Sequence, residues 1–173
     1  MSLHQVHHEE SLSLLWNILR AHYFAWRDAA VALCPDVDRH DLVQVMWSRA
    51  GCETADAIVE ALDRSRPLTN QVAAALALTS RALGEAAITS DTQGREQAWI
   101  ASRSCPWLAW HERRGLEDED RLGCDAWFAS TVARLNELLG TRLEVETEAC
   151  RPDGDAECRR RIFVETAPSF FDL

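Results

Sequence analysis

Two cysteines, Cys150 and Cys158, stand on either side of the turn-forming segment Pro-Asp-Gly-Asp. A redox pair, a disulfide and a metal clamp all use two thiols that a turn brings to one side of a hairpin, and the spacing here suits metal ligation. Two more cysteines each precede a segment with a helical pattern, where the helix dipole favours the thiolate. We therefore predict one metal site, with zinc as the cofactor and an iron–sulfur cluster as the alternative. Its ligands would be Cys105, Cys124, Cys150 and Cys158.

The composition limits the class of protein. The chain has 173 residues, 47% of them hydrophobic, which suits one domain with a core of its own. Its 18 basic and 28 acidic residues give a net charge of -10, which disfavours nucleic acid and an anionic membrane surface as partners. No secretory leader or membrane-spanning run is visible, so we expect a cytoplasmic protein. In that compartment six cysteines are expected to be thiols or metal ligands.

Apolar residues at three- and four-residue steps predict that the first half of the chain, residues 1–83, is helical. One long amphipathic helix is expected over 9–33. A break at Cys-Pro-Asp and a capping aspartate then introduce a second helical stretch over 38–62, which a glycine could divide in two. A third helix over 68–84 is rich in strong helix formers and ends at a glycine.

Residues 84–173 change character and predict a sheet together with further helices. Alternating patterns and turn signals predict four strands, over 85–90, 97–103, 143–149 and 159–165. Helices are expected over 105–115 and 124–140, and the charged run 112–121 is interpreted as an exposed connector. The fold class is therefore an α/β protein of the α+β kind, a single domain over 1–173 with a helical N-terminal half packed on an antiparallel sheet.

The stretch CDAWFASTVARLNELLGTRLEVETEACRPDGDAECRRRIF resembles the closing motif of the four-vinyl-reductase-type ligand-binding domain, which is also the sensor module of bacterial phenol-responsive activators. Five residues match the motif, namely Cys124, Gly140, Cys150, Gly154 and Cys158. The resemblance implies an α/β domain that binds aromatic effectors between helices and sheet and pairs as a homodimer. It also implies a structural zinc held by the three cysteines and a glutamate.

The chain departs from that motif at the glutamate position, where it has Thr147. Either Cys105 completes the ligand set, or Glu146 or Glu148 does. The segments LWNILRAHYFAWRDAAVALCPDVDRHDLVQVMWSRAG and SCPWLAWHERRGL more loosely resemble small proteins described as aminothiazoline-carboxylate hydrolase-like, which also tend to have a Cys-Pro before the second cysteine. This second resemblance supports the four-cysteine site.

Seven tryptophans indicate an aromatic wall for an apolar ligand. We predict a small-molecule-binding domain with a cysteine-ligated structural metal. Candidate lining residues for its ligand are Trp99, Trp107, His22 and Trp47. An enzyme remains as the alternative, either a hydrolase of a small heterocycle or a reductive iron–sulfur protein. A third possibility is an adaptor that dimerises through its N-terminal helices.

Overall fold

The computed structural model is a four-stranded antiparallel sheet with helices on one of its faces, and it describes residues 3–91 and 96–164. The helices are α1 (Leu3–Leu33), α2 (Arg39–Ile58), α3 (Leu68–Ala82), α4 (Pro106–Glu112) and α5 (Glu117–Leu139), with short 3-10 turns at Val59–Ala61 and Arg151–Asp153. The strands are β1 (Ala87–Asp91), β2 (Gln97–Ser102), β3 (Leu143–Ala149) and β4 (Cys158–Val164). The predicted α+β fold with a helical N-terminal half is confirmed.

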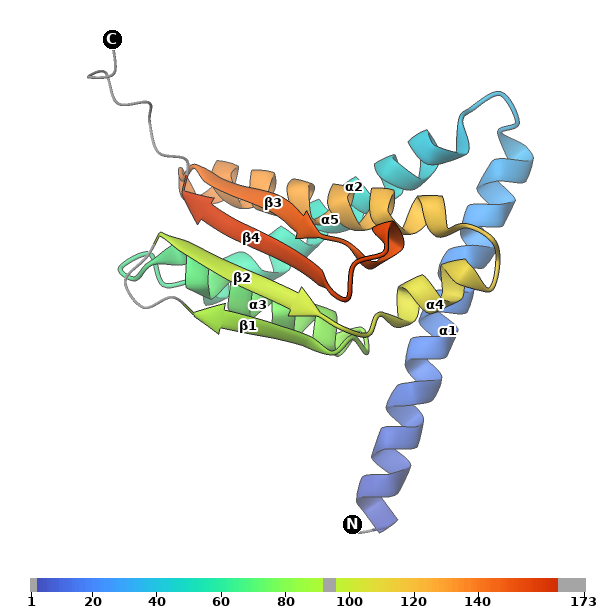
Figure 1. The fold of residues 1–173 in the computed structure, drawn as a ribbon, viewed down its shortest axis with the longest axis horizontal. Coiled ribbons are helices and arrows are strands. Elements are labelled where there is room, and N and C mark those ends of the chain that lie inside the picture. Colours follow the sequence, from blue (N-terminus) through green and yellow to red (C-terminus); the bar gives the residue numbers. More distant parts are fainter. Residues whose placement is uncertain (1–2, 92–95, 165–173) are drawn as a thin grey trace.

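The sheet has the strand order β1-β2-β4-β3. The β1–β2 and β3–β4 hairpins, both predicted from the sequence, therefore pair with each other through β2 and β4. Ile162 of β4 lies opposite Ala98 on one side and Val145 on the other, and Ile162 and Ala98 are buried. Helices α3 and α5 pack on this inner face, and α2 packs on α5 as a further layer (Figure 1). The predicted loop residues 92–95 and the strand end at Glu165 lie outside the described residues.

The contact between α2 and α5 depends on two glycines. A Cβ atom at Gly123 would lie 2.4 Å from Cδ1 of Trp47, and one at Gly51 would lie 2.6 Å from the carbonyl oxygen of Trp127. Because any larger side chain would push the axes apart, these glycines set how closely the two helices approach. Helix α2 therefore runs through Gly51 without a break, although the sequence suggested that it could divide there.

Helix α1 is attached both by directed polar bonds and by the buried ring of Phe24, which packs on Trp110 and His111 of α4. The indole nitrogen of Trp16 and the guanidinium of Arg20 donate to two carbonyl oxygens at the end of α3, at 2.7 and 2.6 Å. Further along, Arg27 forms an ion pair with Glu119 of α5. The N-terminal part of α1 projects away from the body (Figure 1). No helix formed by the described residues is both long and apolar enough to span a membrane.

The charged run 112–121 is not the exposed connector that the sequence predicted, because α5 begins within it. Glu119 is fully buried, since Arg27 neutralises its charge, and the acidic first turn suits the positive end of the helix dipole. Cys124 therefore lies inside α5 rather than at its start. The helix-dipole argument for a Cys124 thiolate is wrong for this reason.

Candidate functional site

An apolar groove of about 720 Å³ lies between α1 and α2. Its α1 wall is formed by Leu19, His22, Tyr23, Trp26, Arg27 and Ala30. Its α2 wall is formed by Leu42, Val43, Val45, Met46, Trp47, Ala50 and Thr54. Trp107 of α4 and Trp127 of α5 also line it, with Thr79 and Leu83 from the region of α3. Helix α1 contacts the body through the buried ring of Phe24 and through polar bonds, and other apolar side chains of α1 and α2 line the groove.

The inner end of the groove is a rigid aromatic cluster. Tyr23, Trp47 and Trp107 lie with ring centroids 5.3 to 5.6 Å apart, mostly edge to face. The Trp47 indole nitrogen donates to the Tyr23 hydroxyl at 3.2 Å. Burial raises the pKa of Tyr23 to about 12, so its hydroxyl stays neutral. The wall is therefore an uncharged surface suited to apolar contact.

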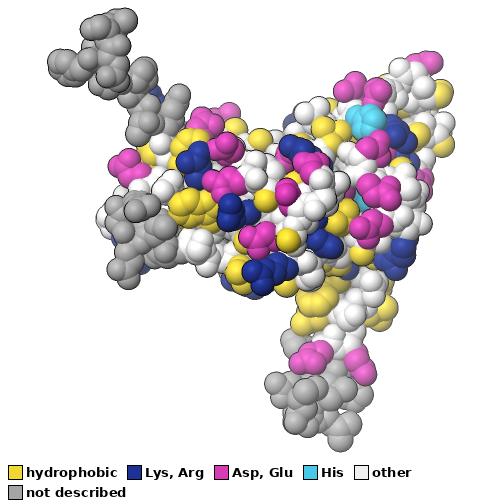
Figure 2. All heavy atoms as spheres, viewed as in Figure 1, with side chains coloured by type: hydrophobic (Ala, Val, Ile, Leu, Met, Phe, Trp, Pro, Cys, Tyr) yellow, Lys and Arg dark blue, Asp and Glu magenta, His cyan; other side chains and the backbone are white. Residues whose placement is uncertain are grey.

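Three of the four predicted lining residues come together here, because His22, Trp47 and Trp107 all line the groove. Trp99 does not line it. Trp99 lies on β2, where its indole nitrogen donates to Glu148 at 3.1 Å. The outer face of the sheet, which Figure 2 shows, carries alternating arginines and acidic residues that pair across the strands. A ligand-binding role for the four predicted lining residues, His22, Trp47, Trp99 and Trp107, stays a prediction.

The four predicted ligand cysteines line one small cavity of about 30 Å³ next to the sheet. Burial raises the pKa of Cys105 and of Cys150 to about 12, and that of Cys124 well above its ordinary value. These thiols are therefore protonated at neutral pH. Within residues 3–91 and 96–164, no group of three or more histidine, cysteine or acidic side chains is arranged to hold a metal ion. The assignment of these four cysteines as metal ligands stays a prediction.

Thr147 and its neighbours face a charge network instead of a metal. The Thr147 hydroxyl donates to Asp125 at 2.8 Å, and the guanidinium of Arg160 donates to the same oxygen at 2.8 Å. Arg160 is buried and its charge acts on Cys124 and Cys158. The position that the family motif gives to a glutamate is thus used to hold Asp125 in place.

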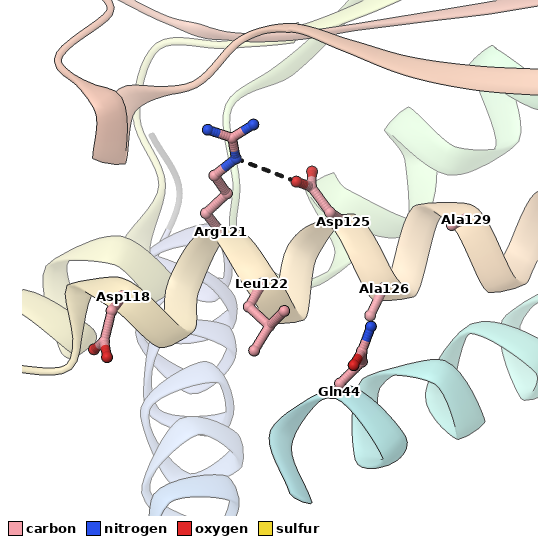
Figure 3. A pocket seen from close by; sticks show the side chains of 7 residues that line it. All are labelled: Gln44, Asp118, Arg121, Leu122, Asp125, Ala126 and Ala129. Atoms are coloured by element: carbon pink, nitrogen blue, oxygen red, sulfur yellow. Dashed lines mark hydrogen bonds and ion pairs between the residues drawn. The ribbon is translucent and has the colours of Figure 1, made fainter. Parts of the chain in front are cut away.

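A second hollow of about 390 Å³ lies on the surface along α2 and α5. Figure 3 shows its lining side chains, with Arg121 and Asp125 joined by an ion pair of 3.4 Å. Arg121 also pairs with Asp153. Because these charges pair with one another, the hollow offers no free charge for a ligand.

Comparison with known proteins gives one informative result. No family model matches the chain, and no curated protein matches it. Among solved structures, it is similar to a trafficking protein particle complex subunit 3 from Naegleria fowleri, crystallised with covalently bound palmitic acid. The similarity has a TM-score of 0.59 at 14% identity and covers 89% of this chain and 97% of the other. At this identity it shows a shared fold.

Two predictions are corrected by these findings. The resemblance to the four-vinyl-reductase-type domain and to the aminothiazoline-carboxylate hydrolase-like family is wrong, because the structural match is to a trafficking complex subunit. The predicted function, a small-molecule-binding domain with a structural metal, is wrong as well. It fails because no metal-holding group exists among the described residues and because the matched fold belongs to a complex subunit. The choice between zinc and iron–sulfur as cofactor stays a prediction.

The feature that the sequence reading missed is a second apolar stripe on α1. The first stripe, which faces the body, includes Phe24. The second is outward and strongly exposed, as the exposed fractions show for Leu15 (59%), Leu19 (44%), Trp26 (78%) and Leu33 (82%). A signal was available in the adjacent apolar pairs Leu14-Leu15 and Ile18-Leu19, because one narrow buried face cannot hold both members of a pair. In the structure all four side chains are exposed.

Proposed function

We propose that this chain is an assembly protein that pairs with a second copy of itself through α1 and α2. The observation that carries the proposal is the outward stripe of α1, which we call the α1 seam. Its positions follow alternating steps of three and four residues, the repeat of helices that pack side by side. The α1 seam consists of Leu12, Leu15, Leu19, His22, Trp26, Ala29 and Leu33.

The size and shape of the apolar surface favour a helix as its occupant. The α1 seam rises by about 31 Å from its first to its last residue, at 1.5 Å per residue. The groove borders only its middle part, at Leu19, His22 and Trp26. A small molecule in the groove would leave Leu15 and Leu33 in water, whereas a helix of a second chain would cover them. Hydrophobic side chains gather on α1 just outside the body in Figure 2.

The α1 seam is suited to antiparallel pairing with itself. With His22 at a two-fold axis, Leu19 of one copy would face Trp26 of the other, and Leu15 would face Ala29 in the same way. Large side chains would thus meet smaller ones, as close packing requires. No seam position is acidic or basic apart from His22 at the axis, so the net charge of -10 does not oppose contact within the seam itself. Val45 and Met46 of α2, both exposed, would extend the same surface.

The structural neighbour supports pairing between chains and also indicates an alternative occupant. That protein is described as a subunit of a particle complex, and it carries covalently bound palmitic acid. The described residues that line the groove include no cysteine. Cys105 and Cys124 line an adjoining cavity that shares Trp47, Leu83, Trp107 and Trp127 with the groove. An acyl chain is therefore the occupant that the experiment must separate from a second copy of the chain.

Sedimentation velocity over a concentration series tests the proposal. The wild-type protein should be a dimer at about 10 µM, since an interface of standard size is expected here. Leu19→Glu and Trp26→Glu should each give a monomer, because each places charge inside an apolar contact. Ile88→Glu is the matched control, since the exposure of Ile88 (61%) lies between those of Leu19 and Trp26 but Ile88 is on β1 and not in the groove. It should remain a dimer.

Two outcomes would contradict self-pairing. A wild-type monomer at about 100 µM would leave no interface of useful strength. Native mass spectrometry that shows a monomer with a retained fatty acid would assign the groove to an acyl chain instead. His22→Leu adds a positive test, because replacing a polar residue at the axis with leucine should strengthen the dimer.

A further inference from the structure

His22 is the only ionisable side chain in the α1 seam, and it lies at the centre of that seam. Its side chain is exposed in the single chain and lines the groove between α1 and α2. Histidine is the side chain that ordinarily gains or loses a proton between about pH 5 and 8. The middle of the proposed contact therefore carries the side chain best suited to respond to pH.

The surroundings of His22 offer no negative charge to balance a proton. Among the described residues that line the groove, the other ionisable side chains are Tyr23 and Arg27, both on α1. Tyr23 is neutral, and Arg27 is positive and already paired with Glu119 and Asp28. The wall residues that come from α2, α3, α4 and α5 are uncharged. A protonated His22 in this contact would therefore have no carboxylate of the groove as its partner.

We propose that His22 makes self-pairing sensitive to pH, with a dimer that is stable above about pH 7 and dissociates as the pH falls toward about 5.5. This inference rests on the proposed function, because it needs two α1 seams paired antiparallel with His22 at the two-fold axis. Helices that pack side by side have axes about 8 to 10 Å apart, so the two imidazoles at the axis would lie in contact. Two protonated imidazoles there would repel each other and lose the water that solvates their charges.

Proton linkage gives the direction of the effect. The exposed histidine of the monomer can take up a proton, whereas the dimer excludes it, so acid favours dissociation. Two ordinary histidines that must both be neutral in a dimer raise its dissociation constant about 100-fold between about pH 7.5 and 5.5. The overall charge acts in the opposite direction, because acid reduces the net charge of -10 and so weakens repulsion between the copies. A dimer that weakens in acid would therefore indicate a local charge in the contact.

Sedimentation velocity at about pH 7.5 and 5.5, at one ionic strength, tests the role of His22. The wild-type dissociation constant should rise about 100-fold at the lower pH. His22→Gln keeps a polar side chain but cannot take up a proton, so its dissociation constant should be the same at both pH values. His40→Gln is the matched control, because it removes another surface histidine, which pairs with Asp118 outside the groove. It should keep the wild-type pH dependence, and far-UV circular dichroism checks that every chain stays folded at both pH values.

The outcomes separate the role of His22 from self-pairing itself. A wild-type protein that is monomeric at the higher pH would contradict self-pairing, and the role of His22 would fall with it. A dimer with the same dissociation constant at both pH values would overturn the role of His22 alone and leave self-pairing in place. An equal weakening of the His22→Gln dimer in acid would do the same, because charges elsewhere in the chain would then cause it.

Discussion

The two long helices α2 and α1 join the rest of the molecule by opposite means. Helix α2 meets α5 through apolar surface so close that Gly51 and Gly123 leave no room for a side chain. Helix α1 is held by Trp16, Arg20 and Arg27 through hydrogen bonds and an ion pair. Its apolar seam remains exposed. Helix α1 also buries Phe24 against α4, so its attachment combines apolar with polar contacts, whereas that of α2 is dominated by close apolar packing.

This difference indicates that the exposed apolar stripe of α1, unlike the buried Phe24, is not needed for folding of the single chain. Hydrophobic burial is not directional, whereas hydrogen bonds and ion pairs fix an orientation. Polar attachment therefore holds α1 at a defined angle while leaving the α1 seam and the groove free. A second chain can then cover both.

The largest effect should come from breaking the polar attachment at its buried end. Glu119→Ala removes the fully buried partner of the Arg27 guanidinium, which keeps only its contact with the exposed Asp28. We expect a loss of about 3 to 5 kcal/mol of unfolding free energy, as is usual when one partner of a buried ion pair is removed. Urea denaturation measures it.

The matched control for this variant is Glu137→Ala. Glu137 also pairs with an arginine, Arg134, but both side chains are exposed. Removing an exposed pair should cost less than about 1 kcal/mol. If both variants lost the same stability, the attachment of α1 would not depend on burial of the charge.

The next effect should come from the apolar contact. Gly123→Val places two methyl groups where a single Cβ already lies 2.4 Å from Trp47, so the helices must separate. We expect a loss of about 2 to 3 kcal/mol, the usual range for overpacking. Ala129→Val on the exposed side of the same helix should cost less than about 1 kcal/mol, through helix propensity alone. Thermal and urea unfolding measure both variants. If Gly123→Val and Ala129→Val lost the same unfolding free energy, Gly123 would not be a packing constraint.

A smaller effect is expected at Glu85, which lies between Arg20 and Arg160 in the polar interior. Burial raises the pKa of Glu85 from its ordinary 4.5 to about 7. A raised pKa means that the folded state holds the proton more tightly, so stability falls as pH rises from about 4.5 through 7. Glu85→Gln should therefore stabilise the protein by about 2 kcal/mol at pH 8, allowing for partial exposure. At pH 4.5 the two proteins should unfold alike, and a gap there would contradict the assignment.

The smallest effect should be at the surface pair His40–Asp118, which joins the starts of α2 and α5 at 2.8 Å. The hydrogen bond to Asp118 raises the pKa of His40 above its ordinary 6.5. A raised histidine pKa gives stability that is full below pH 6.5 and is lost as pH rises through the folded-state value. The pair is exposed, so the change should be less than about 1 kcal/mol. His40→Ala should remove this slope from a plot of stability against pH.

The sequence located most elements, but it failed where charge decided the outcome. The start of α5 was read as solvent-exposed because its residues are acidic. Only the fold shows that Arg27, 92 positions away, reaches Glu119 and allows it to be buried. The cysteines show the same limit. The sequence predicted that all four lie close together, but their spacing does not determine whether the sulfur atoms lie at metal-bonding distance or only line a common cavity.

The sequence by itself determined the helices, the hairpins and the sheet, because hydrophobic period, caps and turns act over a few neighbouring residues. The tertiary structure decided which apolar face of α1 is covered. That face carries Phe24, which packs on α4, as well as Arg20 and Arg27, whose partners lie at the end of α3 and on α5. Such partners are set by the packing of the whole chain.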